Sequence, residues 1–498
     1  MRSVSQKAAR FLTLAALIVF ACVLALVTLG ALGTTASSAV ANNRMNQRVM
    51  LARDGFGGLA LTAALLLALA AVHAFLRRRA GRRAFAAALA LWTAAALCFV
   101  LSVGLLPRAD SALVIEAAKR FAAGDFSPLE GEYFSRVSYQ LGICLPLEGL
   151  ARLLPGLDLN LLMQALNCVI SAALMALLCG LAGGLSGDAR TSGAAALLYM
   201  AFVPMLLLCV LAMRCFARCA RTGERRFGVL YALLIGAAAA LKPNAMIVML
   251  ALLICAAVHA LQRKDGFLLL CAALSAVLCF ALPAGVIRLY ELRAGVTLAP
   301  DTGMLLRLAM GMQDSMIAAG WYNGVIEEYW PLSVTPEMEK AAALEMLAAR
   351  LREFAADPAG AWAFFKEKCL TQWAEPSYDI LWYGAVCGKS GRFNGLAHAI
   401  FRDGSPVRAL LAGYMNIFQQ AAYVLALIGT CGMIREKRTE AVQLMLPVTV
   451  LGGFLYHMLF EAKSQYIYPY MLLLLPLAAA GMDLLAGRAR NKRKEWRE

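Results

Sequence analysis

Long apolar runs separated by short polar segments dominate the hydropathy pattern of this chain. A run of about 20 apolar residues matches a helix that crosses a bilayer core about 30 Å thick. The pattern therefore predicts an all-α polytopic membrane protein. Eleven runs fit this length, namely 11–32, 56–76, 84–106, 158–184, 193–217, 227–241, 244–262, 267–289, 412–434, 440–460 and 465–486.

Lysine and arginine gather between these runs, and such basic clusters normally stay in the cytoplasm. The first run lacks a clean cleavage site, so we expect a retained helix and not a signal peptide. Both termini are then predicted to be cytoplasmic. The clusters are Arg2 to Arg10, Arg77 to Arg83, Arg214 to Arg226, Arg263 with Lys264, Arg435 to Arg438, and Arg488 to Arg497.

Eleven spans do not satisfy all of these clusters, because Leu106 should lie outside and Arg218 inside. We therefore predict about 12 transmembrane helices (11–13), with the additional crossing at 139–155, "YQLGICLPLEGLARLLP". This stretch is short and carries Glu148 and Arg152. In the alternative, 139–155 is a re-entrant or interfacial helix and the Arg218 cluster lies outside.

This orientation places two polar segments on the outer face. In the first, 107–138, an amphipathic helix should begin at Asp110 and lie along the membrane surface. The second, 290–411, is too long for a plain loop, and we expect helices at 336–357 and 358–373. The predicted domains are a membrane domain at 1–289, an extracytoplasmic helical loop at 290–411, and three membrane helices with a basic tail at 412–498.

Composition supports a membrane protein and excludes several site types. The 498 residues are 61% hydrophobic and 16% charged, unlike soluble domains. The net charge of +16 comes from clusters between apolar runs, so it indicates topology and no nucleic-acid partner is expected. The 14 cysteines and 4 histidines show no metal-ligand spacing. No metal or other cofactor is predicted, although a divalent metal is not excluded.

Several local stretches, together with this architecture, give the chain a family resemblance. It resembles the GT-C membrane glycosyltransferases, especially the protein-mannosyltransferase and aminoarabinose-transferase relatives (glycosyltransferase family 39 type). Each stretch is weakly specific alone. The stretches are the leading Asp110 with its amphipathic helix, "GEYFSRVSYQLG" (131–142), "LKPNA" (241–245), "GMQDSMIAAGWYNG" (311–324), "TQWAEPSYDILW" (371–382) and "FEAKSQYIYPYMLLLLPLAAAG" (460–481).

The resemblance implies a cell-membrane enzyme that transfers a sugar from a polyprenyl-phosphate donor to an unidentified acceptor on the outer face. In that family an acidic residue of the first outer loop acts on the acceptor hydroxyl, and this role maps to Asp110. Capping of the helix that starts there is an equally simple explanation for this aspartate. Membrane lipids are the other expected partners.

Basic residues should stabilise the phosphate that leaves as an anion. Lys242 and Lys463 are candidates because each lies at the outer end of an apolar run, where it must meet an anion or extend to the interface. Arg136 is a third candidate. Weaker candidates for the substrate cavity are Tyr133, Gln140, Tyr322 and Tyr466.

The chain departs from the family in two places. It has no Asp-x-Asp pair near Asp110, and 192–218 is shortened to the length of one passage. The second departure leaves open an altered cavity or a loss of activity. Two other functions therefore remain possible from the sequence: a transporter or flippase of lipid-linked sugars, or an inactive membrane scaffold.

Overall fold

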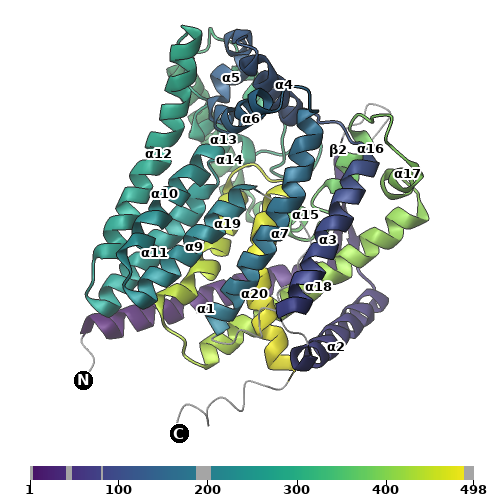
Figure 1. The fold of residues 1–498 in the computed structure, drawn as a ribbon, viewed down its shortest axis with the longest axis vertical. Helices are drawn as coiled ribbons and strands as arrows, with labels where there is room; N and C mark the ends of the chain where they lie inside the picture. The colour runs from purple at the N-terminus through teal and green to yellow at the C-terminus, as the bar shows by residue number, and fades with distance from the viewer. Residues whose placement is uncertain (1–3, 41–46, 80–81, 187–203, 487–498) are drawn as a thin grey trace.

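The computed structural model describes residues 4–40, 47–79, 82–186 and 204–486, and helices make up most of them (Figure 1). In these residues nine helical segments are long and apolar enough to cross a membrane: α1 (Val4–Gly33), α2 (Phe56–Arg79), α3 (Arg82–Val103), α7 (Leu159–Ser186), α11 (Ala245–Arg263), α12 (Phe267–Ala294), α18 (Pro406–Arg435), α19 (Met445–Leu459) together with residues 441–444 before it, and α20 (Ser464–Leu485). The predicted all-α, multi-pass membrane protein is thus confirmed at this level.

The shorter elements complete the bundle and its two ends. They are β1 (Thr34–Val40), β2 (Gln47–Arg53), α4 (Asp110–Ala122), η1 (Ser127–Glu130), α5 (Glu132–Arg136), η2 (Ser138–Gln140), α6 (Leu141–Leu153), α9 (Pro204–Thr222), α10 (Arg225–Leu241), α13 (Met304–Gly311), η3 (Val325–Tyr329), α14 (Pro336–Ala356), α15 (Pro358–Trp373), α16 (Ile380–Val386), α17 (Gly395–Phe401) and η4 (Ala441–Leu444).

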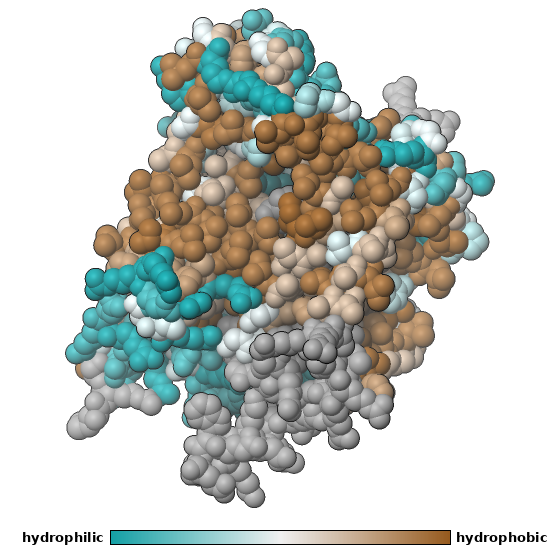
Figure 2. Space-filling view, in the orientation of Figure 1, coloured by the Kyte–Doolittle hydropathy of each residue, from teal (hydrophilic) through white to brown (hydrophobic). Residues whose placement is uncertain are grey.

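A polar cap closes one end of the bundle. It consists of α4, α5, α6, α13 and α14, which lie together at the top of Figure 1. Figure 2 shows hydrophilic residues at this end, an apolar band below it, and a second hydrophilic region at the opposite end. Such a band between two polar ends is the surface expected of a protein that crosses a bilayer.

Helix α6 belongs to the polar cap. With 13 residues it is about 20 Å long, shorter than a bilayer core. Leu141, Cys144 and Leu147 share a buried core with Phe121 of α4. Glu148 accepts a hydrogen bond from Tyr290 at 2.7 Å and pairs with Arg152 and Arg293. The expected crossing at 139–155 is therefore not what the structure shows.

Helices α7 and α9 lie side by side in the same direction. Arg214 donates to the Leu177 carbonyl at 3.3 Å, and Arg221 donates to the Gly184 carbonyl at 2.9 Å. Both bonds span 37 residues, as in parallel helices. The last turns of α7 and α9 therefore lie at the same end of the bundle. The predicted run 193–217 and the shortened 192–218 region lie partly outside the described residues.

A β-hairpin after α1 was not predicted. β1 and β2 pair antiparallel, with Thr34 opposite Arg53 and Val40 opposite Gln47. The Ala36 amide donates to the Ala374 carbonyl at 2.8 Å, so the hairpin is fixed against the end of α15. These strands are short and lie between two long apolar helices, so their alternating pattern is not evident from the hydropathy of the chain.

The long polar segment contains the expected pair of helices. α14 begins after Thr335, whose side chain accepts a hydrogen bond from the Met338 amide, and Asp357 caps α15 in the same way. The predicted boundaries at 289 and 411 shift, because α12 continues to Ala294 and α18 begins at Pro406. Helix ends depend on such capping residues more than on the end of an apolar run.

Candidate functional site

Three breaks between helices meet under the polar cap. Asp110 is the first residue of α4, Lys242 follows α10, and Lys463 precedes α20. The charges of Asp110 and Lys463 both act on Lys242. The structure therefore brings together the three ionisable groups singled out from the sequence, although 353 residues separate the first from the last.

Asp110 is presented to solvent and does not cap its helix. Ala109 before it has a φ of 49°, in the left-handed region that side-chain-bearing residues rarely adopt. The start of α4 has no side-chain cap, and Asp110 is exposed. Capping thus does not explain this aspartate, and a strained backbone at such a position is typical of functional sites.

Lys242 lies where the chain breaks between α10 and α11. It is extended, and Pro243 and Asn244 separate it from the start of α11. Its ammonium nitrogen is 5.9 Å from the centre of the Tyr466 ring. Burial lowers the pKa of Lys242, although its side chain keeps contact with solvent, and the nearby Asp110 carboxylate acts in the opposite direction.

Two further charged residues complete the group, which we call the ionisable cluster: Asp110, Lys242, Arg307, Glu461 and Lys463. Glu461 interacts with Lys463, Arg307 and Asp110, and burial raises its pKa. One Arg307 nitrogen, Nη2, is buried without a hydrogen-bond partner. Sequence reasoning missed both. The signals were an acidic neighbour of Lys463 in "EAKSQY" and a lone arginine in the apolar helix "MLLRLAMG".

Tyrosines surround the ionisable cluster. Tyr133 lies beside Asp110, and burial, followed by the charge of that carboxylate, raises its pKa. Tyr466 donates to Glu461 at 3.5 Å, whereas Tyr322 is held by Glu327. Gln140 lies beside Tyr133. The four weaker candidates from the sequence are therefore all at or next to the ionisable cluster, together with Tyr139, which was not selected.

Arg136 is not part of the ionisable cluster, which corrects the expectation that it binds phosphate. The side chain is 1% exposed. Its guanidinium donates to the carbonyls of Trp330, Pro331 and Val334 at 3.1, 2.8 and 2.9 Å, and to that of Pro300 at 3.4 Å. With its donors used on backbone carbonyls, Arg136 joins the two polar segments to each other.

Close backbone contacts position the ionisable cluster. A Cβ at Gly142 would lie 1.6 Å from the Ala240 carbonyl oxygen, and one at Gly311 would lie 2.3 Å from the Phe460 backbone. Only glycine permits these approaches. The first contact fixes the chain just before Lys242, and the second fixes it just before Glu461.

Lys368 and Trp321 tie the long polar segment to the same place. The buried Lys368 ammonium donates to the carbonyls of Gly311 and Leu459. Trp321 donates to Thr371 at 3.0 Å and pairs with Ala462 through a β-bridge. Three of the stretches that carry the family resemblance, 311–324, 371–382 and 460–481, are therefore in contact.

Behind Lys463 lies a buried acidic turn. Asp379 accepts hydrogen bonds on Oδ1 from Ser38 at 2.6 Å and Gln47 at 2.8 Å, both in the hairpin. Its Oδ2 has no partner in the described structure. Burial, followed by repulsion from Asp379, raises the pKa of Glu375 to about 7. The charge of Lys463 acts on Asp379, so this turn adjoins the ionisable cluster.

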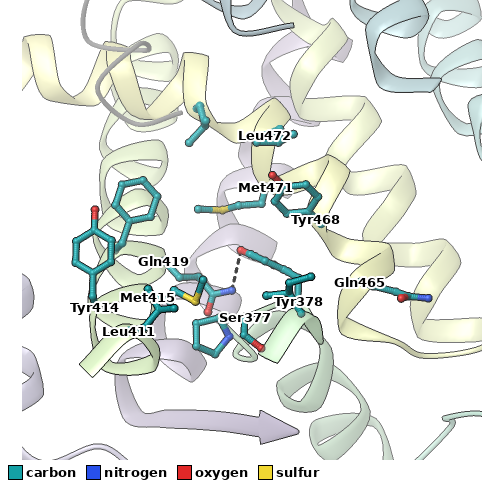
Figure 3. A pocket seen from close by; sticks show the side chains of 14 residues that line it. Ser377, Tyr378, Leu411, Tyr414, Met415, Gln419, Gln465, Tyr468, Met471 and Leu472 are labelled. Carbon is teal, nitrogen blue, oxygen red and sulfur yellow. Dashed lines mark hydrogen bonds between the residues drawn. The ribbon is translucent and has the colours of Figure 1, made fainter. Parts of the chain in front are cut away.

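An apolar pocket opens next to this turn, between α18 and α20 (Figure 3). Its cavity volume is about 430 Å³. Leu411, Met415 and Leu472 line it, and its few polar groups include Gln419, which donates to the Tyr378 hydroxyl at 2.9 Å. Gln465, two residues after Lys463 in the chain, also lines the pocket.

Comparison of the chain with protein family models, curated proteins and solved structures gives no match.

Proposed function

We propose that this protein is a GT-C type membrane glycosyltransferase that takes its sugar from a polyprenyl-phosphate donor at the outer face of the membrane. The observation that carries this proposal is the exposed Asp110 carboxylate beside Lys242 and Lys463 at one end of an apolar helix bundle. A carboxylate next to cations, at the depth of lipid head groups, suits a reaction between a lipid phosphate and a polar acceptor.

The reaction would be a direct displacement with inversion. An acceptor hydroxyl oxygen forms a bond to the anomeric carbon while the bond from that carbon to the phosphate oxygen breaks. Asp110 accepts the hydroxyl proton. The electron pair of the broken bond stays on the polyprenyl phosphate, where Lys242 and Lys463 stabilise the added negative charge.

The donor's chain would occupy the apolar pocket of Figure 3. The pocket lies between two membrane helices and is lined by Leu411, Met415 and Leu472, surfaces that suit an isoprenoid. Gln465, which also lines the pocket, is two residues from Lys463 in the chain. A donor bound this way would have its phosphate at the ionisable cluster and its chain in lipid or protein.

The alternative of a lipid-sugar transporter receives less support. Transporters carry ionisable residues near the bilayer midplane. Glu148 is the residue that the sequence placed within a possible membrane crossing. In the structure it lies in the polar cap and is paired with Arg152 and Arg293. The ionisable cluster also lies at one end of the bundle and not at its middle.

The test is donor cleavage by the full-length protein in nanodiscs, supplied with a panel of polyprenyl-phosphate sugars. We expect Asp110→Asn to lower the rate about 10²- to 10⁴-fold, the usual contribution of a general base. Asp125→Asn is the matched control, because Asp125 is on the same polar segment but pairs with Arg120 at 2.7 Å. An Asp110→Asn variant as fast as the wild type would remove Asp110 from the mechanism. Movement of the donor across vesicles without cleavage would instead favour a flippase.

A further inference from the structure

A second pocket lies at the other end of the bundle from the ionisable cluster, between α7 and α9. Its cavity volume is about 470 Å³. Arg214, Arg218 and Arg221 line it, spaced so that they share one face of α9. Because α7 begins beside Leu105, under the polar cap, and these contacts involve its last turns, the pocket lies at the far end.

These arginines retain unused hydrogen-bonding capacity. Arg214 and Arg221 each donate to one backbone carbonyl of α7, at 3.3 and 2.9 Å. Among the described residues neither has a carboxylate within ion-pair distance. Arg218 pairs with Glu224 at 3.2 Å, but Glu224 also pairs with Arg226. A guanidinium carries five N–H donors, so the pocket has an excess of positive charge and of free donors.

Two glycines of α7 leave room for the side chains of Arg214 and Arg221. A Cβ at Gly180 would lie 2.1 Å from Arg214 Nη1, and one at Gly184 would lie 3.3 Å from Arg221 Nη1. Both positions are one helical turn apart on α7. Glycine at these two positions leaves room for the guanidinium groups to approach α7 closely.

The remaining walls of the pocket are apolar. Leu177, Leu181 and Leu211 contribute them, with the ring of Phe227 under the Arg218 guanidinium at 4.2 Å. A free inorganic anion gains nothing from contact with apolar side chains. A phospholipid fits both parts of the pocket, because its phosphate can accept paired hydrogen bonds from arginine while its acyl chains contact the leucines.

We propose that this pocket binds the phosphate head group of an anionic phospholipid. Basic pockets between membrane helices on the cytoplasmic side are suited to such lipids. By the distribution of basic residues, this end is the one expected in the cytoplasm. The site is independent of the proposed transfer reaction and lies at the opposite end of the bundle.

The test is titration of the detergent-purified full-length protein with phosphatidylglycerol or phosphatidylcholine, followed by native mass spectrometry. We expect phosphatidylglycerol to bind at least tenfold more tightly than phosphatidylcholine. Arg214→Gln/Arg221→Gln should remove this preference. Arg225→Gln/Arg226→Gln, which also removes two positive charges but leaves the pocket lining intact, should change the affinity less than twofold.

A charge-conserving variant keeps the test informative if the glutamine variant fails to fold. Arg214→Lys/Arg221→Lys retains both charges but loses the guanidinium fork, and we expect it to bind phosphatidylglycerol at least threefold more weakly. Wild-type affinity in this variant, or equal losses in the two glutamine variants, would overturn the proposal. Displacement of the lipid by millimolar inorganic phosphate would also overturn it, because the pocket would then be a site for the free anion.

Discussion

Asp379 and Glu375 place two carboxyl groups in a buried turn directly behind Lys463. Each is 2% exposed, and Asp379 has a left-handed backbone with a φ of 67°. Burial first, and then the charge of the other carboxyl, raises the pKa of Glu375 to about 7. The turn nevertheless persists because amides and side chains of the hairpin and of the turn itself donate to both carboxyl groups.

This buried pair makes stability depend on pH. Between an unfolded pKa of about 4.5 and a folded pKa of about 7, the folded protein holds a proton at Glu375 that the unfolded chain has released. Stability therefore falls as the pH rises through this window. Asp379→Asn keeps a side-chain oxygen that can accept hydrogen bonds from Ser38 and Gln47. It removes the negative charge beside Glu375.

We expect Asp379→Asn to raise stability at pH 8 by about 1–2 kcal/mol and to change it little at pH 5. Thermal unfolding of both proteins in detergent at the two pH values measures this. An Asp379→Asn variant that is less stable than the wild type at pH 8 would show that the Asp379 charge is needed, for example by Lys463.

Residue by residue, the candidate site was only partly predictable from the sequence. Asp110, Lys242 and Lys463 could be found because each is a charge at the end of an apolar run. Arg136 is also a basic residue of the first polar segment. Only its hydrogen bonds to four backbone carbonyls exclude it from the ionisable cluster. Arg307 carried only the weak signal of a lone arginine in an apolar stretch, and the Asp379 turn could not be found, because its importance depends on contacts between segments far apart in the chain.

At the scale of helices, close packing of small residues fixes the C-terminal part of the bundle. A Cβ at Gly429 of α18 would lie 2.1 Å from the Leu477 carbonyl oxygen of α20, and one at Gly481 would lie 1.9 Å from that of Leu425. Glycine at such points lets two membrane helices approach through their backbones. These two helices also form the walls of the apolar pocket, and Lys463 immediately precedes α20.

We expect Gly429→Ala to destabilise the protein by about 1–3 kcal/mol, the usual cost of overpacking, because neither backbone can yield without moving a whole helix. Gly413→Ala on the same helix is the control, since a Cβ there meets nothing within 4 Å. Thermal unfolding in detergent compares the two. Equal melting temperatures would mean that α18 and α20 do not pack as described.

The helices themselves were predictable because long apolar runs specify them. α14 also followed from a Pro start and an acidic first turn, and α15 was expected to follow it from Pro358. The β-hairpin and the place of α6 were not. Glu148 and Arg152 made 139–155 a poor membrane span, but only Arg293 and Tyr290 of α12 show where Glu148 belongs.

At the scale of the whole molecule, an apolar band separates two ends with different chemistry (Figure 2). One end holds the ionisable cluster beneath the polar cap, where carboxylates and cations meet. The other end presents arginines with few acidic partners. In the proposed division of roles, the first end handles a lipid-linked sugar and the second anchors the protein to anionic lipid.

The proposed transfer reaction depends most on Lys242 and Lys463 holding the phosphate of a lipid donor. Its most direct test is binding of a polyprenyl monophosphate to the full-length protein in nanodiscs. We expect Lys242→Gln/Lys463→Gln to weaken binding at least tenfold, and Lys340→Gln/Lys366→Gln, at two exposed lysines of α14 and α15, to leave it unchanged. Wild-type affinity in the first variant, or equal losses in both, would contradict the role assigned to these two lysines.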